Sequence, residues 1–412
     1  MTTRLISAII TTVCLGIMTA AAQVLPGIEV LKQNRFEGLR GKRVGLITNP
    51  TGIDNSLRST IDILHAAPEV QLAALFAPEH GVRGDIHAGD HVDASVDAAT
   101  GVAVRSIYGR NRKPTAEMLK DIDVLVYDIQ DIGCRSYTFI STMGLAMQAC
   151  AEFGKEFMVL DRPNPLGGNK VEGNLVEDGC YSFVSQFPIP YIYGLTPGEL
   201  ALYLNDSGLL GEKRTDLTVV PMKGWKRSMD FRATGMPWVL PSPHIPTPES
   251  AVYYPMSGIL GELTGYMSIG VGYTEPFKLF CAEWVDADKL AKRLNARAIP
   301  GIIFRPIHIK PFYSTGQGKH LQGVEIYVTD IESAPLSLTQ FYVMEELAAM
   351  YPAHKAFAAV TQQRLNMFDK VCGSKEIRKL FSRRYRVDDM ADYWNKDAAG
   401  FRSATAKYHL YD

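Results

Sequence analysis

Short apolar runs alternate with helix-forming segments through the first half of this 412-residue chain. The runs are RVGLIT (43–48), QLAALFA (71–77), VAVRSIYG (102–109), DVLVYDI (123–129), EFMVLD (156–161) and LTVVPM (217–222). Helical patterns occur at 59–66, 116–120, 142–153 and 197–205. Apolar strands that alternate with helices are typical of a parallel sheet with both faces covered. The N-terminal part is therefore predicted to form an α/β domain with a Rossmann-like, mostly parallel sheet.

A proline-rich segment, MPWVLPSPHIPTPESAVYYP (236–255), follows this alternation. Proline lacks the N–H that a strand ladder needs and restricts the residue before it, so we expect an ordered, extended connection. Beyond it, strand-like runs at 277–285, 301–309 and 323–330 mix with helical patterns at 286–297 and 336–350. We predict a Rossmann-like domain over 23–245 and a smaller α+β auxiliary domain over 246–412.

The first 22 residues are typical of an export signal. Arg4 precedes a mostly apolar stretch over 5–18, and small residues at 20–22 suit a cleavage site. An uncleaved anchor or a lipid on Cys14 are the alternatives, and the small-residue exit favours cleavage. No later segment has the roughly 18 apolar residues that a membrane span needs. The mature chain is therefore expected to be periplasmic or extracellular, without a membrane span.

The charge balance gives no support for a nucleic-acid partner, because 43 Lys plus Arg nearly equal 44 Asp plus Glu. The sequence has no G-x-G-x-x-G after the first strand, no Walker motif and no G-x-S-x-G elbow, so we expect no nucleotide cofactor. The cysteines are scattered and form no C-x-x-C pair, which indicates neither a disulfide framework nor a zinc site. No cofactor is predicted.

Polar side chains follow several of the predicted strands. Ligands of open parallel sheets bind outside the carboxyl ends of the strands, so these side chains are expected to converge on one edge. The candidates are Glu79, His80, Asp128, Arg135, Tyr137, Asp161, Arg162, Asn164, Asn169 and Glu172. For Asp128 and Arg135, a structural ion-pair network near a strand end is the alternative to substrate positioning.

Two of the candidates are glutamates set in turns. Glu79 lies between Pro78 and His80-Gly81, and Glu172 lies in GGNKVEGN. Glycoside cleavage uses one carboxyl group as an acid and a second as a base or nucleophile. We assign the acid role to Glu79, because apolar neighbours are expected to raise the pKa of its carboxyl. A capping glutamate or an ion pair with Arg83 is the structural alternative.

His80, His87 and His91 suggest a second possibility, a metal-dependent hydrolase. Their spacings of seven and four residues are loose, and Gly84 and Gly89 oppose a helix that would align them. A third possibility is a cell-wall protein that binds sugars without turnover. Aromatic residues support sugar binding weakly, because they are equally common in cores.

Six motifs together resemble one known family. They are FAPEHGVRG (76–84), VYDIQDIGCRSYTFISTM (126–143), DRPNPLGG with VEG (161–173), YGLTPGELA (193–201), LPSPHIPT (240–247) and FDKVCG (368–373). In this order they resemble the exo-β-N-acetylmuramidase family of the NamZ type. The resemblance implies an enzyme that releases N-acetylmuramic acid from the non-reducing end of peptidoglycan-derived saccharides. It also implies a Rossmann-like domain, a smaller second domain with a cleft between them, and catalytic glutamates at Glu79 and Glu172.

The chain departs from the family pattern at one position. The pattern has S-V-G-R-G-T in the second half, whereas this chain has SIGVGYT (268–274), with Val271 in place of arginine. An arginine there would bind the lactyl carboxylate of muramic acid, or a phosphate, in bidentate fashion. The departure therefore concerns the form of the substrate, and Lys278 or Lys319 are the nearby cations that could replace it.

Overall fold

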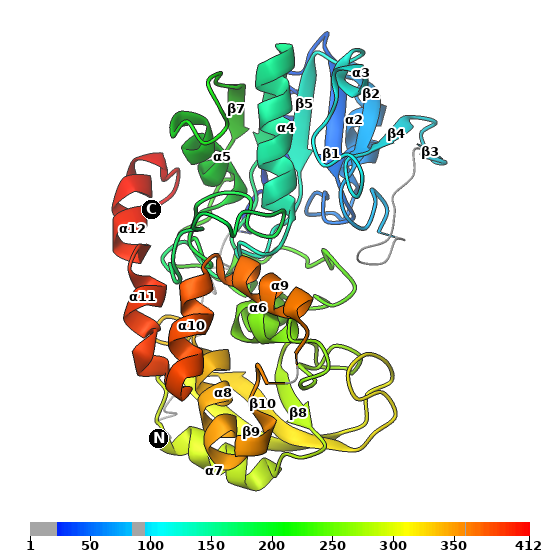
Figure 1. Ribbon diagram of the computed structural model, residues 1–412. Helices are drawn as coiled ribbons and strands as arrows, with labels where there is room; N and C mark the ends of the chain where they lie inside the picture. The colour runs from blue at the N-terminus through cyan, green and yellow to red at the C-terminus, as the bar shows by residue number, and fades with distance from the viewer. Residues whose placement is uncertain (1–22, 85–94, 359) are drawn as a thin grey trace, which may run out of the picture.

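The computed structural model describes residues 23–84, 95–358 and 360–412. In these residues the N-terminal part of the chain forms a sheet of seven strands in the order β3-β4-β2-β1-β5-β6-β7 (Figure 1). The strands are β1 (Arg43–Thr48), β2 (Gln71–Ala77), β3 (Ser95–Val96), β4 (Ala103–Ser106), β5 (Val124–Asp128), β6 (Glu156–Leu160) and β7 (Asp216–Val220). All neighbouring pairs are parallel except β3 with β4.

The parallel strands have the Rossmann order. Counted along the chain, β4-β2-β1-β5-β6-β7 corresponds to 3-2-1-4-5-6, with the switch point between β1 and β5. The register of β1 on β5 runs from Val44 opposite Val124 to Thr48 opposite Asp128. The predicted Rossmann-like sheet is therefore confirmed, and all six predicted strands of the first half are present.

Helices cover both faces of this sheet. They are α1 (Gly27–Gln33), α2 (Thr60–Ala66), α3 (Ala116–Leu119), α4 (Phe139–Phe153) and α5 (Pro197–Asp206). Successive residues of β1 point to opposite faces, so Leu46 packs with α1 and α2 while Ile47 packs with α4. The N-terminus of α5 is fixed by a capping box between Thr196 and Glu199.

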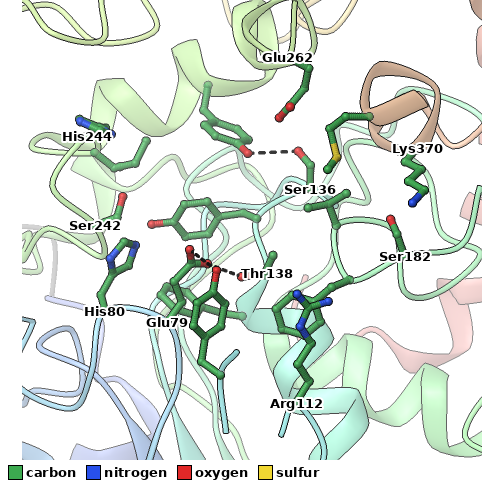
Figure 2. A pocket seen from close by; sticks show the side chains of 18 of the residues that line it. Glu79, His80, Arg112, Ser136, Thr138, Ser182, Ser242, His244, Glu262 and Lys370 are labelled. Carbon is green, nitrogen blue, oxygen red and sulfur yellow. Dashed lines mark hydrogen bonds between the residues drawn. The ribbon is translucent and has the colours of Figure 1, made fainter. Parts of the chain in front are cut away.

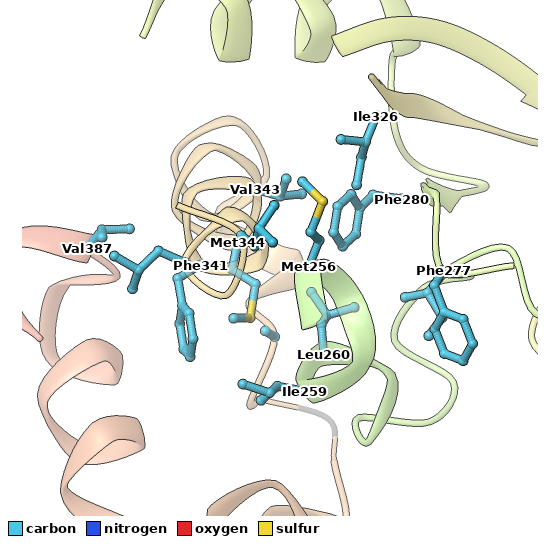
Figure 3. Packing of buried hydrophobic residues seen from close by; sticks show 14 of the residues in the cluster. Met256, Ile259, Leu260, Phe277, Phe280, Ile326, Phe341, Val343, Met344 and Val387 are labelled. Atoms are coloured by element: carbon cyan, nitrogen blue, oxygen red, sulfur yellow. The ribbon is translucent and has the colours of Figure 1, made fainter. Parts of the chain in front are cut away.

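The second half contains a smaller sheet of three antiparallel strands. Within the described residues its order is β8-β10-β9, with β8 (Leu279–Ala282), β9 (Ile302–Ile309) and β10 (Leu321–Val328). The helices α6 (Pro248–Gly261), α7 (Ala287–Ala296) and α8 (Thr339–Met350) pack with it. Figure 3 shows Met256 and Leu260 of α6 against Met344 of α8, next to Phe280 and Ile326 of the sheet. The predicted α+β second part is confirmed, whereas the boundary at residue 245 stays a prediction.

The proline-rich segment is only partly extended. Its second half forms α6, with Thr247 as N-cap, Pro248 in the first turn and Pro255 inside the helix. The expectation of a fully extended connection is therefore wrong from residue 248 onward. A proline in the first turn removes no helical hydrogen bond, and the buried face of α6 outweighs the bond that Pro255 cannot make.

The polar C-terminal part forms helices that return to the N-terminal sheet. They are α9 (Gln362–Cys372), α10 (Lys375–Arg384), α11 (Ala391–Asn395) and α12 (Ala398–Thr405), and short 3-10 helices occupy Arg232–Thr234, Pro352–His354, Val387–Asp389 and Ala406–Tyr408. In Figure 1, α12 runs beside α5, where the rings of Phe401 and Tyr203 are 5.3 Å apart. The hydroxyl of Tyr411 donates a hydrogen bond to Oδ2 of Asp161, the residue that follows β6, at 2.5 Å. The chain end thus stabilises the packing of the two parts.

Two further features concern the environment of the chain. In the described ranges, no helix has the length and apolar character to cross a membrane. The cysteines of the same ranges are free and buried, so burial raises the pKa of the thiols of Cys134, Cys150 and Cys281 to about 12.

Candidate active site

A cavity of about 530 Å³ lies between the carboxyl edge of the large sheet and the helices α6 and α9 (Figure 2). Its volume is in the range of cavities that bind one small ligand. The loops after β2, β4 and β5 supply one wall, and the proline-rich segment, α6 and α9 supply the other. The polar side chains that line it are Glu79, His80, Tyr108, Arg112, Ser136, Tyr137, Thr138, Ser182, Ser242, His244, Tyr254, Glu262 and Lys370.

Glu79 is held in a fixed direction at the end of β2. His80 has the left-handed backbone conformation (φ +72°), which is unfavourable for a residue with a side chain, and Gly81 follows at φ +75°. This tight turn directs the carboxylate into the cavity. The hydroxyl of Tyr108 donates to Oε1 of Glu79 at 2.8 Å, and that of Thr138 donates to Oε2 at 2.9 Å.

The donors to Glu79 stay protonated. Burial and the neighbouring Glu79 carboxylate raise the pKa of Tyr108 well above its usual value, so its hydroxyl remains a proton donor at neutral pH. Thr138 stands directly before α4, where the preceding loop leaves β5. The arrangement gives each oxygen of the Glu79 carboxyl group one hydrogen-bond donor, which fixes the direction of the group.

A second carboxyl group, Glu262, faces the same cavity from the end of α6 (Figure 2). Its side chain is 30% exposed, and Arg364 lies 3.9 Å away. Burial raises the pKa of the Glu262 carboxyl above its usual value, and the charge of Arg364 opposes this shift. The cavity therefore presents two carboxyl groups in unlike surroundings, one held by two hydroxyl donors and one whose pKa is raised by burial.

Two cationic side chains, Arg112 and Lys370, complete one side of the cavity. The guanidinium of Arg112 lies 4.4 Å from the ring centroid of Phe183, and the turn containing Phe183 is fixed by Ser141, which donates to its carbonyl at 2.7 Å. Ser185 donates to the carbonyl of Lys370 at 2.6 Å, which ties α9 to the same turn. In the described part of the chain neither cation has an ion-pair partner.

Only some of the predicted site residues line this cavity. Glu79, His80 and Tyr137 do, and the ring of Tyr137 packs edge-on against Tyr254 at 5.6 Å. These three side chains lie together because the loops after β2 and β5 meet at the switch region of the sheet. Their chemical roles stay predictions.

Glu172 lies outside the cavity that Glu79 lines, so the structure does not bring the expected pair together there, and the catalytic role of Glu172 stays a prediction. It lines a separate cavity of about 440 Å³, together with Asn169 and Lys170. Its Oε2 accepts hydrogen bonds from the backbone N–H and the hydroxyl of Ser337, at 2.8 and 2.6 Å, and Lys170 lies 3.2 Å from Oε1. The backbone of Glu172 pairs with Ile192, which turns its side chain toward the segment before α8. The contacts of Glu172 join the two parts of the chain.

Asp128 and Arg162 form a buried ion pair instead of lining the cavity. Arg162 donates to both carboxylate oxygens of Asp128 and to the carbonyl of Ile53, and Thr60 donates to the same carboxylate. Both side chains are at most 2% exposed. The structural alternative considered for Asp128 is therefore the arrangement observed, because the strand end is covered by the loop after β1.

Arg135, Asp161 and Asn164 are likewise buried among protein partners. The guanidinium of Arg135 donates to the carbonyls of Asn174, Ile189 and Val371, and burial lowers its pKa to about 10. Asp161 accepts from Thr196, Gly198 and Tyr411, while burial raises its pKa to about 6. The side-chain amide of Asn164 donates a hydrogen bond to the carbonyl of Leu195 and accepts one from the backbone N–H of Leu166. These side chains position loops and do not reach the cavity.

The residues considered for the missing arginine also lie elsewhere. Val271 packs against the core of the second part and is not among the lining residues. Lys278 pairs with Glu325 at 2.8 Å, and Lys319 pairs with Glu283 at 2.7 Å. The cations that line the cavity are Arg112 and Lys370, which sequence patterns did not single out.

The hypothesis of a metal-dependent hydrolase is not supported by any cluster of metal ligands among the residues that the structure describes. Among them, no group of three His, Cys, Asp or Glu side chains could hold a metal ion. His80 lines the cavity, whereas His87 and His91 lie outside the described residues. Glu262 was missed because it ends α6 with no motif around it, and Lys370 was missed because its motif, FDKVCG (368–373), was used only for the family resemblance; the fold brings both to the strand ends.

Both halves of the chain match models of one protein family. The family model for exo-beta-N-acetylmuramidase NamZ, N-terminal, matches residues 44–249, and the corresponding C-terminal model matches residues 252–411. The peptidoglycan beta-N-acetylmuramidase NamZ of Bacillus subtilis (strain 168) is 44% identical over 389 residues. That alignment covers 94% of this chain and 92% of the relative.

Solved structures agree with the fold. A crystal structure of a DUF1343 family protein from Bacteroides fragilis NCTC 9343 has a TM-score of 0.91 and 62% identity, covering 95% of this chain and 99% of that chain. A second DUF1343 family protein of the same organism has a TM-score of 0.73 at 26% identity, with the same coverage. The two family models together span both sheets, and the chain therefore belongs to the exo-beta-N-acetylmuramidase NamZ family.

Proposed function

We propose that this protein is a glycoside hydrolase that releases N-acetylmuramic acid from the non-reducing end of peptidoglycan fragments. The family assignment and the Bacillus subtilis relative support this reaction class. The observation that carries the proposal is the pair of carboxyl groups, Glu79 and Glu262, in one cavity of about 530 Å³.

The two carboxyl groups suit the two tasks of acetal cleavage. Glu262, whose pKa is raised by burial, donates its proton to the leaving glycosidic oxygen. Glu79, oriented by Tyr108 and Thr138, acts as the base or nucleophile at the anomeric carbon. This reverses the acid role first expected for Glu79, and it replaces Glu172 with Glu262 as the second carboxyl group.

Arg112 and Lys370 give the cavity a preference for an anionic sugar. Muramic acid differs from glucosamine by a lactyl ether that ends in a carboxylate. A carboxylate placed between a guanidinium and an ammonium forms charge-assisted hydrogen bonds, which are stronger than neutral ones. The two cations therefore take the role that the family pattern suggested for an arginine at position 271.

We also propose that the protein acts outside the cytoplasm. The support is the sequence pattern of the first 22 residues, which lie outside the described residues. A peptidoglycan substrate fits this location. Sequencing of the N-terminus of the protein recovered from the native host tests it, with a new terminus near residue 23 as the expected result.

Incubation with defined disaccharides tests the reaction. Muramic-acid-terminated disaccharides, with and without a peptide stem, are digested and the products are identified by mass spectrometry. Free N-acetylmuramic acid is the expected product, and its formation after prolonged EDTA treatment excludes the metal-dependent alternative. Binding of the disaccharide without release of any product would instead identify a sugar-binding protein.

A further inference from the structure

Two neighbouring aromatic side chains are exposed on the loop between β9 and β10. Phe312 is 68% exposed and Tyr313 is 49% exposed. Single exposed apolar residues are ordinary, but adjacent large rings in solvent are typical of binding surfaces. Their place in the fold therefore needs an explanation.

Each of the two rings stacks on a ring from another segment. Tyr313 stacks on His244 with centroids 6.1 Å apart, and its hydroxyl lies 3.0 Å from Nε2 of His244. Phe312 stacks on Tyr273 with centroids 5.9 Å apart and planes 17° from parallel. We call His244, Tyr313, Phe312 and Tyr273 the aromatic strip.

Backbone contacts hold the strip in place. The N–H of Phe312 donates to the carbonyl of Gly272 at 2.7 Å, and that of Gly318 donates to Pro311 at 2.9 Å. Gly272 has φ +92°, and a Cβ at this position would lie 1.9 Å from the carbonyl oxygen of Tyr313. Only glycine allows the two loops to pack this closely, so the strip is a preformed surface.

The strip connects the catalytic cavity to a second hollow. His244 lines the catalytic cavity, whereas Tyr273 and Phe312 line a hollow of about 750 Å³. Polar side chains accompany the rings in this hollow, namely His308, Lys310, Gln317, His320 and Gln322. Rings that present flat faces beside amide and cationic groups suit sugars, which combine apolar ring faces with hydroxyl and N-acetyl groups.

The position of the strip fixes which part of a saccharide it can reach. In Figure 2, His244 lies on the left of the cavity and Arg112 and Lys370 lie on the right, with Glu79 at the lower left and Glu262 at the top. In the proposed reaction the lactyl carboxylate of the terminal sugar binds the cations. The bond to be cleaved then faces the carboxyl groups, and the rest of the strand leaves past His244.

We propose that the aromatic strip binds the sugar residues on the reducing-end side of the cleaved bond. This inference rests on the proposed function, because it takes the direction of the strand from the terminal muramic acid. Phe312 and Tyr313 stack on successive sugars that the catalytic cavity is too small to hold. The strip thus makes the enzyme favour strands over short glycosides.

The test is a binding series in the Glu79→Gln protein, which holds the ligand without cleaving it. Affinities for methyl N-acetylmuramoside and for a peptide-free strand of at least four sugars are measured by calorimetry. The strand is expected to bind more tightly than the glycoside. Phe312→Ala and Tyr313→Ala are each expected to weaken strand binding roughly two- to tenfold and to leave glycoside binding unchanged.

Controls separate a sugar-binding strip from other roles. Ile303→Ala removes a 52% exposed apolar side chain at the far end of β9 and should change neither affinity. Phe312→Tyr keeps a flat ring and should retain strand binding. Equal weakening for both ligands, or no weakening for either, overturns the proposal. If Phe312→Ala or Tyr313→Ala changed the elution volume in gel filtration but left strand binding unchanged, the strip would instead be a contact between two copies of this chain.

The outcome is independent of turnover. If the wild-type protein cleaves no muramoside, the proposed function fails, and the binding series still decides whether the strip recognises a strand. If turnover is present but the alanine variants bind the strand as the parent does, only the strip assignment fails.

Discussion

Glu79 after β2 and Glu262 at the end of α6 line one cavity, and their carboxyl groups have unlike surroundings. Glu79 accepts hydrogen bonds from two hydroxyl groups, whereas burial raises the pKa of Glu262. The pair spans the two parts of the chain, because Glu79 follows β2 of the large sheet whereas Glu262 ends α6, which packs with α8. The cavity lined by both carboxyl groups therefore exists only in the folded, two-part molecule.

The roles of the two carboxyl groups predict different responses to the leaving group. Glu262→Gln should lower kcat/KM for a natural disaccharide about 10²- to 10⁴-fold, because the leaving oxygen loses its proton donor. A nitrophenyl muramoside has a leaving group that needs little protonation, so kcat/KM of Glu262→Gln for this substrate should fall less than tenfold. Glu79→Gln should slow the turnover of both substrates by at least about a hundredfold. Steady-state kinetics on both substrates check this, and equal losses for the two substrates in Glu262→Gln would contradict the acid role.

The pH dependence follows from the raised pKa of Glu262. The acid must carry its proton, so kcat/KM for a disaccharide should fall as the pH rises through this pKa, which lies above the usual value of a glutamic acid. The raised pKa keeps the acid protonated at a higher pH than an exposed glutamate would. A pH–rate profile of wild type and Glu262→Gln measures it. The alkaline fall should be absent in the variant, and an unchanged fall would assign it to another group.

The cations predict the preference for a carboxylate. Arg112→Ala and Lys370→Ala should each lower kcat/KM for a muramoside about 10- to 100-fold, since a hydrogen bond to a charged group contributes about 1.5–3 kcal/mol. Turnover of the corresponding N-acetylglucosaminide, which lacks the carboxylate, should not fall. Lys379→Ala on α10 removes an exposed lysine outside the cavity and is the matched control. Parallel losses on both sugars would show that the cations do not read the carboxylate.

Glu172 is predicted to stabilise the fold. Glu172→Gln weakens the bonds to Ser337 and Lys170, and should lower the free energy of unfolding by about 1–3 kcal/mol. Ser337→Ala should have a similar effect, and the double variant should lose less than the sum because the two share contacts. Urea unfolding measures the stability. If Glu172→Gln instead abolished turnover and left the stability unchanged, this result would support the catalytic role that the sequence predicted for Glu172.

Asp131 predicts a pH-dependent stability. Burial raises its pKa to about 7; its Oδ2 accepts from Gly133 at 2.9 Å and from Tyr193, while Oδ1 has no protein partner. The folded state therefore keeps the proton where the unfolded state loses it, between about pH 4 and 7. The contribution of Asp131 to the free energy of unfolding should fall in this window as the pH rises, by at most about 1.4 kcal/mol per unit, and be level outside it.

The variant Asp131→Asn isolates this contribution. Unfolding in urea at several pH values between 4 and 8 gives the difference in stability between wild type and variant. As the pH rises toward 7, the free energy of unfolding of the variant should increase relative to that of the wild type. A pH-independent difference would show that Asp131 is already ionised in the folded protein at low pH.

The sequence alone predicted the large sheet and several of its loops. Continuous apolar runs such as 124–128 cannot be solvated on either face, so they require a covered parallel sheet. The rule that ligands bind beyond strand ends then located Glu79, His80 and Tyr137. The motifs around these residues also predicted the family, which the two family models confirm.

The sequence could not tell which polar residues at the strand ends reach a cavity. Asp128 and Glu79 both follow buried strands, but Asp128 is covered by Arg162 and Thr60 while Glu79 faces the cavity. Whether a carboxylate is paired or open depends on which loop packs over it, and that is a property of contacts between distant segments. The same reason applies to Glu172, because nothing in its own motif indicates that its carboxylate accepts hydrogen bonds from Ser337.

The sequence by itself determined the sheet, because the pattern of apolar residues along each segment is a local property. Only the tertiary structure decided which side chains line the cavity. Glu262 and Lys370 lie far along the chain from Glu79, and they line the same cavity because α6 and α9 pack over the strand ends to bury their own apolar faces. Burial of those faces, which no local motif records, selects the side chains that meet.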